Sequence, residues 1–244
     1  MTPVFRSDAA VTLVGGAPSD PGAIRAALAR APGLVAADGG AAAALAAGRL
    51  PDAVIGDFDS LDDATRARIP PERLHHIAEQ DSTDFHKCLA RIEAPLILVA
   101  GFAGGRMDHL LAVFNVLVRL PHRRTVVLGP DDLCLLAPPD LTLDLAPGTA
   151  VSLFPMAAVT AESRGLHWPV DGLALAPDAQ SGTSNRATGP VRLCAHAPKL
   201  LLLLPRDTLP QLLEGLATAP GWPAPDEGSQ QGIPVTISNA RNEE

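Results

Sequence analysis

The sequence of 244 residues has few cysteines and few basic residues, and each shortage excludes a class of protein. Its three cysteines, Cys88, Cys134 and Cys194, are scattered and show no Cys-x-x-Cys spacing. This predicts neither a disulfide framework nor a zinc site. Its 27 acidic residues outnumber its 19 lysines and arginines, which gives a formal net charge of −8. Because nucleic acids and anionic membranes bind clustered basic side chains, we expect neither as a partner.

The chain also lacks a long apolar run. Its longest leucine run, Leu200 to Leu204, is far too short to cross a bilayer. The first residues show no basic region followed by an apolar stretch and a cleavage site, so we expect a cytoplasmic protein. Hydrophobic residues nevertheless make up 47% of the sequence, which is enough to build the packed core of a globular protein.

The pattern of the chain changes near residue 137. Before it, short apolar runs such as 33–37 and 96–100 alternate with helical stretches such as 41–47 and 107–120, which predicts an α/β domain over residues 1–137 with a mostly parallel, Rossmann-like sheet. Residues 138–206 hold short strand-like segments broken by Pro and Gly, including 173–176, and these predict a small all-β sandwich or barrel. Residues 207–244 are predicted to be a flexible tail with one short helical turn near 209–216.

Four acidic clusters in the first half of the sequence contain the candidate functional residues. Each follows an apolar run or opens a helix, where the crevice of an open α/β sheet lies. They are Asp38-Gly39-Gly40, Gly56-Asp57-Phe58-Asp59-Ser60, Ser82-Thr83-Asp84 with Lys87, and Gly104-Gly105-Arg106-Met107-Asp108-His109. Carboxylates are ligands for a hard cation such as Mg²⁺, while free glycine amides and arginine suit the phosphates of a nucleotide. The clusters therefore predict an enzyme that uses a metal and a nucleotide.

In two of the clusters, two charged residues lie two or three positions apart. An extended backbone would put Asp57 and Asp59 on one face and Phe58 on the other, so that the two carboxylates share a cation. Taken alone, an acidic turn that closes a strand explains them equally well. Asp84 and Lys87 lie one helical turn apart, where a metal ligand and a phosphate-binding ammonium would project together. An ordinary helical ion pair is the alternative.

The other two clusters combine glycine with charge. Gly104 and Gly105 beside Arg106 free backbone amides for a phosphate chain, and this signal is the sharper of the two. Asp38 with Gly39 could bring a carboxylate and helix-terminal amides to a nucleotide, although a plain turn explains this pair on its own. We expect the histidine of the fourth cluster to cap or pack a helix and not to act as a base.

Together the clusters resemble the thiamine pyrophosphokinase (thiamine diphosphokinase) family. That family's pattern runs Asp-Gly-Gly, Pro-Asp with Gly-Asp-x-Asp-Ser, Thr-Asp-x-x-Lys, then Gly-Gly-Arg-x-Asp-His, and every element occurs here in order. In the second half, Gly165 to Val170 resembles the family's tryptophan segment, and Gly182 to Asn185 resembles its Ser-Asn segment. The resemblance covers about residues 11–205 and leaves the tail unmatched.

The resemblance implies a Mg²⁺-dependent transfer of the diphosphoryl group of ATP to the hydroxyl of thiamine, which yields thiamine diphosphate and AMP. It implies that Asp57, Asp59 and Asp84 hold the metal and, with Arg106, carry catalysis. The residues implied to bind the nucleotide are Asp38, Gly39, Lys87, Gly104, Gly105, Arg106 and Asp108. Those implied to bind thiamine are Trp168, Ser184 and Asn185. Asp59 and Asp84 both remain candidates to accept the proton of the thiamine hydroxyl, and a metal-bound alcohol could need no base.

By the same resemblance we expect a homodimer, with thiamine bound between the α/β domain of one chain and the β domain of its partner. Two other functions are open to this pattern. A pyrophosphokinase for another heterocyclic alcohol, such as a hydroxymethylpterin, would keep the acidic clusters and change the acceptor pocket. A non-catalytic thiamine- or nucleotide-binding module would be expected to lack a metal carboxylate, and none is missing.

Overall fold

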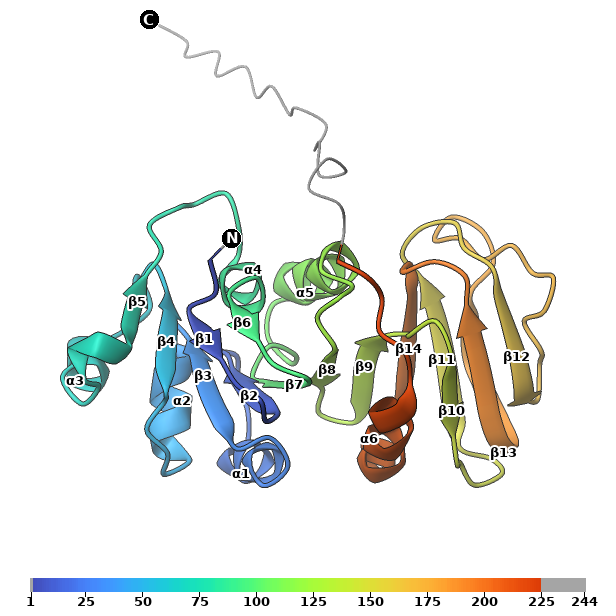
Figure 1. The fold of residues 1–244 in the computed structure, drawn as a ribbon, viewed down its shortest axis with the longest axis horizontal. Helices are drawn as coiled ribbons and strands as arrows, with labels where there is room; N and C mark the ends of the chain where they lie inside the picture. The colour runs from blue at the N-terminus through green and yellow to red at the C-terminus, as the bar shows by residue number, and fades with distance from the viewer. Residues whose placement is uncertain (1, 225–244) are drawn as a thin grey trace, which may run out of the picture.

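The computed structural model describes residues 2–224, and one large mixed sheet runs through most of them (Figure 1). The strand order in this 12-stranded sheet is β10-β13-β11-β14-β9-β8-β7-β2-β3-β4-β5, and β12 pairs with β13. A second, two-stranded sheet pairs β1 (Phe5–Arg6) with β6 (Ile92–Glu93).

One half of the large sheet is parallel. Its strands are β2 (Val11–Val14), β3 (Gly33–Ala37), β4 (Ala53–Gly56), β5 (Leu74–His76), β7 (Ile97–Ala100) and β8 (Thr125–Leu128). All residues of β2, β4, β7 and β8 are buried, as expected of parallel strands that are covered on both faces. The predicted strands of this half are confirmed, and β5 is an edge strand that the sequence pattern did not reveal.

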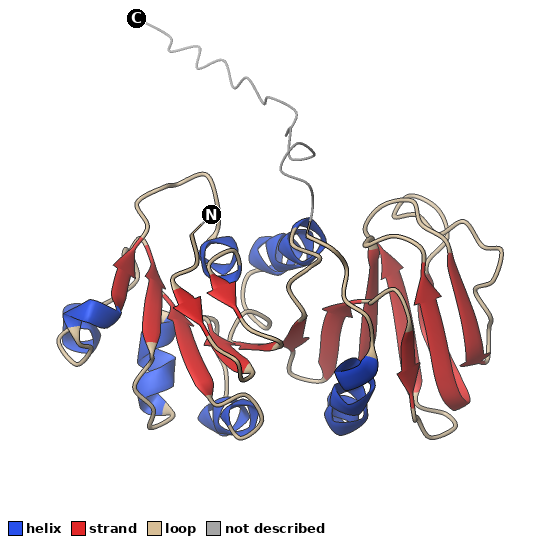
Figure 2. Cartoon of the chain, in the orientation of Figure 1, coloured by secondary structure: helices blue, strands red, loops and turns tan. Residues whose placement is uncertain are grey.

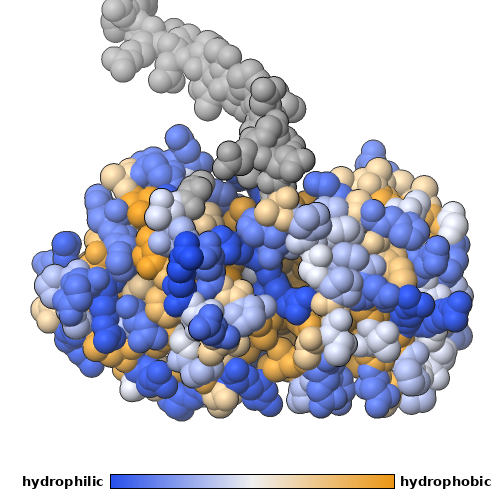
Figure 3. Space-filling view, in the orientation of Figure 1, coloured by the Kyte–Doolittle hydropathy of each residue, from blue (hydrophilic) through white to orange (hydrophobic). Residues whose placement is uncertain are grey.

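Helices cover both faces of the parallel strands (Figures 1 and 2). They are α1 (Pro21–Leu28), α2 (Gly40–Ala46), α4 (Asp84–Leu89) and α5 (Met107–Arg119), while α3 (Asp63–Arg66) and a 3-10 turn (Pro71–Arg73) precede β5. Ile24 of α1 and Ala44 of α2 pack in one core cluster, and Phe85 of α4 and Val116 of α5 pack in another. Figure 3 shows hydrophilic residues over much of one outer face, with apolar residues between them.

The other half of the sheet is antiparallel. Its strands are β9 (Asp132–Leu136), β10 (Leu141–Leu143), β11 (Ala150–Pro155), β12 (Ala161–Leu166), β13 (Gly182–Ala195) and β14 (Leu200–Pro205). The long β13 pairs with β11 at its start and with β10 and β12 toward its end, so it links two groups of strands. Val151 of β11 and Leu193 of β13 lie in one core cluster between these groups. The predicted strand at 173–176 is wrong, because only Leu175 forms isolated bridges there.

The sheet continues across the predicted boundary at residue 137. β9 lies before this boundary, yet it pairs with β8 on one side and with β14 on the other. The division of the chain into domains at 137 and 206 therefore stays a prediction, while the large mixed sheet runs across the boundary at 137.

The first part of the predicted tail is a packed helix, α6 (Leu209–Thr218), which follows a 3-10 turn at Arg206–Thr208. Leu212 and Leu216 are buried, because leucines at positions 209, 212, 213 and 216 form an apolar stripe with helical spacing. The Trp222 indole N–H then donates to the Ala137 carbonyl oxygen at 2.8 Å. The helical turn predicted near 209–216 is confirmed, a flexible tail over 207–224 is wrong, and residues 225–244 lie outside the described residues. Within residues 2–224, none of the helices has the length and apolar character needed to span a membrane.

Candidate active site

The predicted acidic residues gather where neighbouring parallel strands end. Asp38 directly follows β3 and Asp57 directly follows β4, and these two strands pair in parallel. Carboxyl ends of parallel strands meet at one edge of a sheet, which brings the two side chains together. Gly56 permits the close approach, because a Cβ atom there would lie 2.9 Å from the Cβ atom of Asp38.

Three carboxylates form a group that suits a cation. Asp38, Asp57 and Asp59 each offer an oxygen, and these oxygens all lie within 4.8 Å of one another. Asp38 is buried, its Oδ2 accepts from the backbone N–H of Ser60 at 3.0 Å, and its Oδ1 has no hydrogen-bond partner among residues 2–224. A buried carboxylate oxygen is costly to leave unpaired, and a hard cation would satisfy it. The donor set therefore fits Mg²⁺.

Burial also changes the protonation of Asp38. It raises the pKa of this carboxyl group to about 6, and the nearby acidic groups Asp59 and Asp84 add to the rise. The surroundings thus disfavour the charged form of Asp38, and a bound cation would stabilise that form. The raised pKa and the unpaired oxygen both favour a cation at this position.

A turn, and not a pleated strand, brings Asp57 and Asp59 together. β4 ends at Gly56, and Phe58 has a left-handed backbone with φ of 65°. The expected extended backbone over 57–59 is therefore wrong. The backbone N–H of Asp59 donates to Oδ1 of Asp57 at 3.4 Å, so the turn folds the second carboxylate back toward the first.

Lys87 links this group to the helix α4. Its side chain is only 2% exposed, and its Nζ donates to Asp57 Oδ2 at 2.6 Å and to Asp84 Oδ1 at 3.2 Å. The bond from Lys87 lowers the pKa of Asp57, whereas burial raises the pKa of Asp84. Burial disfavours the Lys87 ammonium, but the bonds and charges of both aspartates outweigh this and raise its pKa. Thr83 caps α4, and its Oγ1 accepts from the backbone N–H of His86 at 3.3 Å.

The geometry groups the acidic residues differently from the metal set expected from the sequence. Asp38, which we expected to contact the nucleotide, lies in the carboxylate group with Asp57 and Asp59. Asp84, expected as a metal ligand, instead pairs with Lys87. The signal that could have identified Asp38 is its position at the end of a buried strand beside β4, but pairing of β3 with β4 is not visible in the sequence.

A pocket of about 630 Å³ opens over these residues, within the size range of small-molecule sites. Gly39, Gly105, Arg106 and His109 also line it. Arg106 has a side chain that is 72% exposed, and its Nε donates to Oδ1 of Asp108 at 3.1 Å. Gly104 turns the chain with φ of 94° just before them. Cationic and acidic side chains thus line one concave surface, as a metal-bound polyphosphate would require.

The predicted thiamine residues lie in the antiparallel half. Trp168 follows β12 and is 54% exposed, while Ser184 and Asn185 belong to β13. Asn185 is buried, and its Oδ1 accepts from the backbone N–H groups of Trp168 at 3.1 Å and of Arg186 at 2.9 Å. Its Nδ2 donates to the Trp168 carbonyl oxygen at 2.6 Å. The amide of Asn185 is therefore engaged in fixing the backbone that carries Trp168.

Trp168 has close ring and cation contacts, and Ser184 has an uncommon backbone conformation. The ring of His167 meets the indole edge-on at 4.4 Å between centroids, and the Arg186 guanidinium carbon lies 5.3 Å from the ring centroid. Ser184 has a left-handed backbone with φ of 62°, which is uncommon outside glycine and asparagine, and its N–H donates to Ser152 Oγ at 3.0 Å. Strain of this kind is found at binding sites.

One chain does not bring Trp168 to the acidic pocket. Strands β11, β14, β9, β8, β7 and β2 lie between β13 and β3 in the sheet. At about 4.8 Å per strand this separates the two groups by roughly 30 Å. Most of the predicted metal and phosphate residues therefore line one pocket, while Asp59, Gly104 and Asp108 are not among its lining residues and the predicted thiamine residues lie apart from it.

Comparisons with known proteins agree with these motifs. Residues 24–128 match the family model described as "Thiamin pyrophosphokinase, catalytic domain". Thiamine pyrophosphokinase 1 of Oryza sativa subsp. japonica is 37% identical over 93 residues, which are 33% of this chain and 35% of that protein. Thiamine pyrophosphokinase 1 of Arabidopsis thaliana is 33% identical over 98 residues, 35% of this chain and 36% of that protein. The match thus spans about a third of the length of these curated relatives.

Solved structures extend the similarity of fold to both halves of the chain. Thiamine pyrophosphokinase from Bacillus subtilis has a TM-score of 0.66 at 20% identity, over 80% of this chain and 98% of that one. Yeast thiamin pyrophosphokinase has a TM-score of 0.67 at 18% identity, over 86% of this chain and 94% of that one. Neither of the two other functions open to the sequence is favoured by these comparisons. Residues 24–128 are therefore similar to the thiamin pyrophosphokinase catalytic domain, the family whose motifs the sequence resembles.

Proposed function

We propose that this protein is a thiamine diphosphokinase, which transfers the diphosphoryl group of ATP to the hydroxyl of thiamine. The observation that carries the proposal is the group formed by Asp38, Asp57 and Asp59, with its unpaired buried oxygen, in a pocket that Lys87 and Arg106 also line. The family match over residues 24–128 supports the choice of reaction.

The cofactor in this proposal is Mg²⁺, held by Asp38, Asp57 and Asp59. When bound, it would neutralise and orient the phosphates of ATP. Lys87 fixes Asp57 and Asp84 in place through its two hydrogen bonds and adds positive charge beside the phosphates. Arg106, at the exposed side of the pocket, binds the outer phosphates, and Gly39, Gly104, Gly105 and Asp108 shape the nucleotide site around it.

In the transfer step, the thiamine hydroxyl oxygen bonds to the β-phosphorus of ATP, the bond from this phosphorus to the α-β bridging oxygen breaks, and AMP leaves. The hydroxyl proton has two candidate acceptors, Asp59 and Asp84. Asp84 fits better, because burial raises its pKa and so makes its carboxylate a stronger base, whereas Asp59 belongs to the cation group.

We also propose that the active site is shared between two chains of a homodimer. Trp168 and the Ser184 hydroxyl would contact thiamine, and their separation from the acidic pocket of their own chain supports a second chain as the source. In this arrangement, the predicted Rossmann-like α/β domain (1–137) of one chain binds the nucleotide. The predicted β-sandwich domain (138–206) of the partner chain binds thiamine. A cytoplasmic location stays a prediction of the sequence.

The direct test is to incubate the purified protein with ATP, Mg²⁺ and thiamine and to separate the products by chromatography, with a hydroxymethylpterin as a parallel acceptor. We expect AMP and thiamine diphosphate in equal amounts, and loss of both in an Asp57→Asn variant. Product from the pterin alone would contradict the proposed substrate. Thiamine binding without any product would instead support a binding module.

The shared site has its own test, which mixes two inactive variants. Asp57→Asn removes a cation ligand, and Trp168→Ala removes the acceptor surface. If one chain supplies each part, hybrid dimers formed after mixing contain one intact site, and activity should return to roughly a quarter of the wild-type value. Mixtures as inactive as the separate variants would contradict a shared site.

A further inference from the structure

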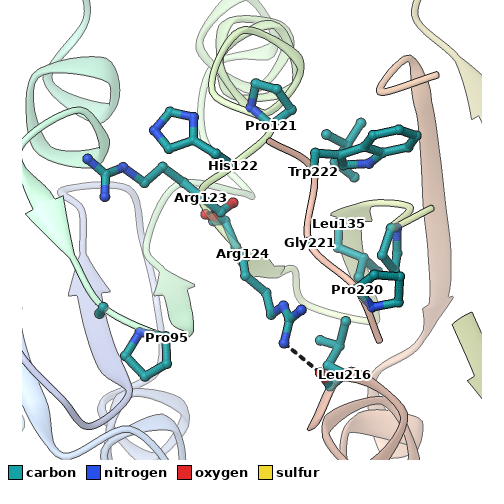
Figure 4. A pocket seen from close by; sticks show the side chains of 14 residues that line it. Pro95, Pro121, His122, Arg123, Arg124, Leu135, Leu216, Pro220, Gly221 and Trp222 are labelled. Carbon is teal, nitrogen blue, oxygen red and sulfur yellow. Dashed lines mark hydrogen bonds between the residues drawn. The ribbon is translucent and has the colours of Figure 1, made fainter. Parts of the chain in front are cut away.

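A second pocket lies at the opposite edge of the parallel strands from the acidic pocket (Figure 4). It measures about 330 Å³, and its walls come from the residues just before β7 and β8, from β9, and from the segment after α6. It shares no lining residue with the acidic pocket. β7 and β8 separate the two pockets by the length of a strand, roughly 13 Å for four residues.

The lining of this pocket is basic. Three consecutive residues, His122, Arg123 and Arg124, contribute to it, and no Asp or Glu is among the described residues that line it. This contrasts with the net charge of −8 for the whole chain. Arg124 is held in place by its bonds to the carbonyl oxygens of Leu216 and Ala219, both at 2.6 Å, so its charge stays fixed at the wall.

Two polar atoms of the lining are buried without partners. Among residues 2–224, neither Nε of Arg123 nor Nδ1 of His122 has a hydrogen-bond partner. Glu93 is the acidic group that acts on Arg123, and Arg6 already pairs with Glu93 at 3.3 Å. Burial without a partner is costly, most of all for a cation, so this wall lacks an acceptor that carries negative charge.

Aromatic and apolar side chains form the facing wall. In Figure 4, the ring of Trp222 lies on the other side of the pocket from His122, with Pro220 below it, and the Arg123 side chain extends away from Trp222. The indole N–H is already bonded to Ala137, so the ring offers its apolar surface. The pocket thus combines a cationic wall with a flat apolar wall.

We propose that this pocket is a second binding site, which takes a small organic oxyanion carrying a phosphate or carboxylate group. The anionic group would accept from Arg123 and remain near Arg124, while the organic part would pack against Trp222 and Pro220. The site is independent of the proposed catalytic function, because its residues differ from those of the acidic pocket.

Trp222 gives a local signal for the test. The chain has only two tryptophans, so a Trp168→Phe background leaves a single indole, which reports by fluorescence and by its N–H resonance. The probes are inorganic phosphate, a phosphomonoester with an aromatic ring, and benzoate, each titrated at constant ionic strength against chloride. We expect a saturable change of the Trp222 signal with at least one probe. Comparison of the two phosphate probes with benzoate shows whether the site binds phosphate or carboxylate groups.

Variants separate this site from the acidic pocket. Arg123→Met should weaken binding about tenfold or more, because a hydrogen bond to a charged group is lost. Arg106→Met, which changes the other pocket, should leave the titration unchanged. His122→Leu is a second variant if Arg123→Met fails to fold, and it should also weaken binding. A Trp222 signal that no probe changes, or binding that Arg106→Met abolishes and Arg123→Met retains, would overturn the proposal.

Discussion

Replacing Lys87 by methionine should destabilise the protein more than the same substitution at Lys199. Methionine keeps the length of the side chain and removes the ammonium that lies 2.6 Å from Asp57 and 3.2 Å from Asp84. The two carboxylates then lose their shared counter-charge within the protein. Lys87 is 2% exposed, so water does not replace its hydrogen bonds in the folded state.

The magnitude follows from the geometry of the pair. Removal of one partner from a buried ion pair costs about 3–5 kcal/mol, because the other charge stays buried. Asp57 has a side chain that is 11% exposed, but that of Asp84 is 34% exposed and regains part of its hydration. We therefore expect a loss near the lower limit, about 3 kcal/mol in the free energy of unfolding. This is a large share of the roughly 5–15 kcal/mol of a typical domain.

The loss should depend on pH in a defined direction. In the wild type, Lys87 lowers the pKa of Asp57 below 3.8. The stabilisation of the folded state by this ion pair is therefore present above pH 3.8 and is lost only as the pH falls through the lowered pKa. Without the ammonium, the pKa values of Asp57 and Asp84 rise, and the folded variant resists their ionisation. The deficit should therefore be larger at about pH 8 than at about pH 5, and Mg²⁺ should reduce it at the higher pH.

Urea unfolding followed by circular dichroism measures this prediction at both pH values, with and without Mg²⁺. Lys199→Met is the matched control, because Lys199 is the only other lysine of the chain and lies in the turn before β14. The control should stay within about 0.5 kcal/mol of the wild type. A Lys87→Met variant that is equally stable, or one whose deficit shrinks as the pH rises, would refute the reasoning.

Three further substitutions test other parts of the structure. The pKa of Asp38 is raised from 3.8 to about 6, so the stabilising effect of its protonated carboxyl group is complete below pH 3.8 and is lost as pH rises through 6. Asp38→Asn should therefore be more stable than the wild type at neutral pH, by about 3 kcal/mol, in thermal unfolding without metal. Mg²⁺ should raise the melting temperature of the wild type only, and equal stabilisation of both would contradict the cation site. Asn185→Ala should raise KM for thiamine with little change in kcat, because it frees the backbone of Trp168, and a fall in kcat at constant KM would contradict this. Arg124→Met should destabilise the end of α6 by about 2–3 kcal/mol in urea unfolding with Trp222 fluorescence, and an unchanged midpoint would argue against this contact.

Local pattern in the sequence was sufficient for much of the fold. The runs 33–37 and 96–100 are strands within one residue of the predicted bounds, and the helical stretch at 107–120 is α5. Short buried runs and helical spacing are properties of neighbouring residues, so they are visible without knowledge of the tertiary structure. The same holds for the pairing of Asp84 with Lys87 one turn later.

Elements with weak local signals were missed. β5 is a three-residue edge strand, and β12 alternates buried and exposed residues around charged side chains. The helix α6 was predicted as one short turn near 209–216, but its packing against the core was not, because the Pro- and Gly-rich residues that follow it are typical of a tail. Its burial depends on contact with β10, which lies far away in the sequence.

The sequence by itself determined which residues could serve a metal and a nucleotide, because those residue types and their spacing are local facts. Only the tertiary structure decided how they group. Asp38 joins Asp57 because β3 and β4 are neighbours, and Lys87 reaches Asp57 across 30 positions of the sequence. Asn185 bonds to the backbone of Trp168 because β12 pairs with β13. Strand order and the contacts between distant segments result from packing of the whole chain, which local periodicity does not encode.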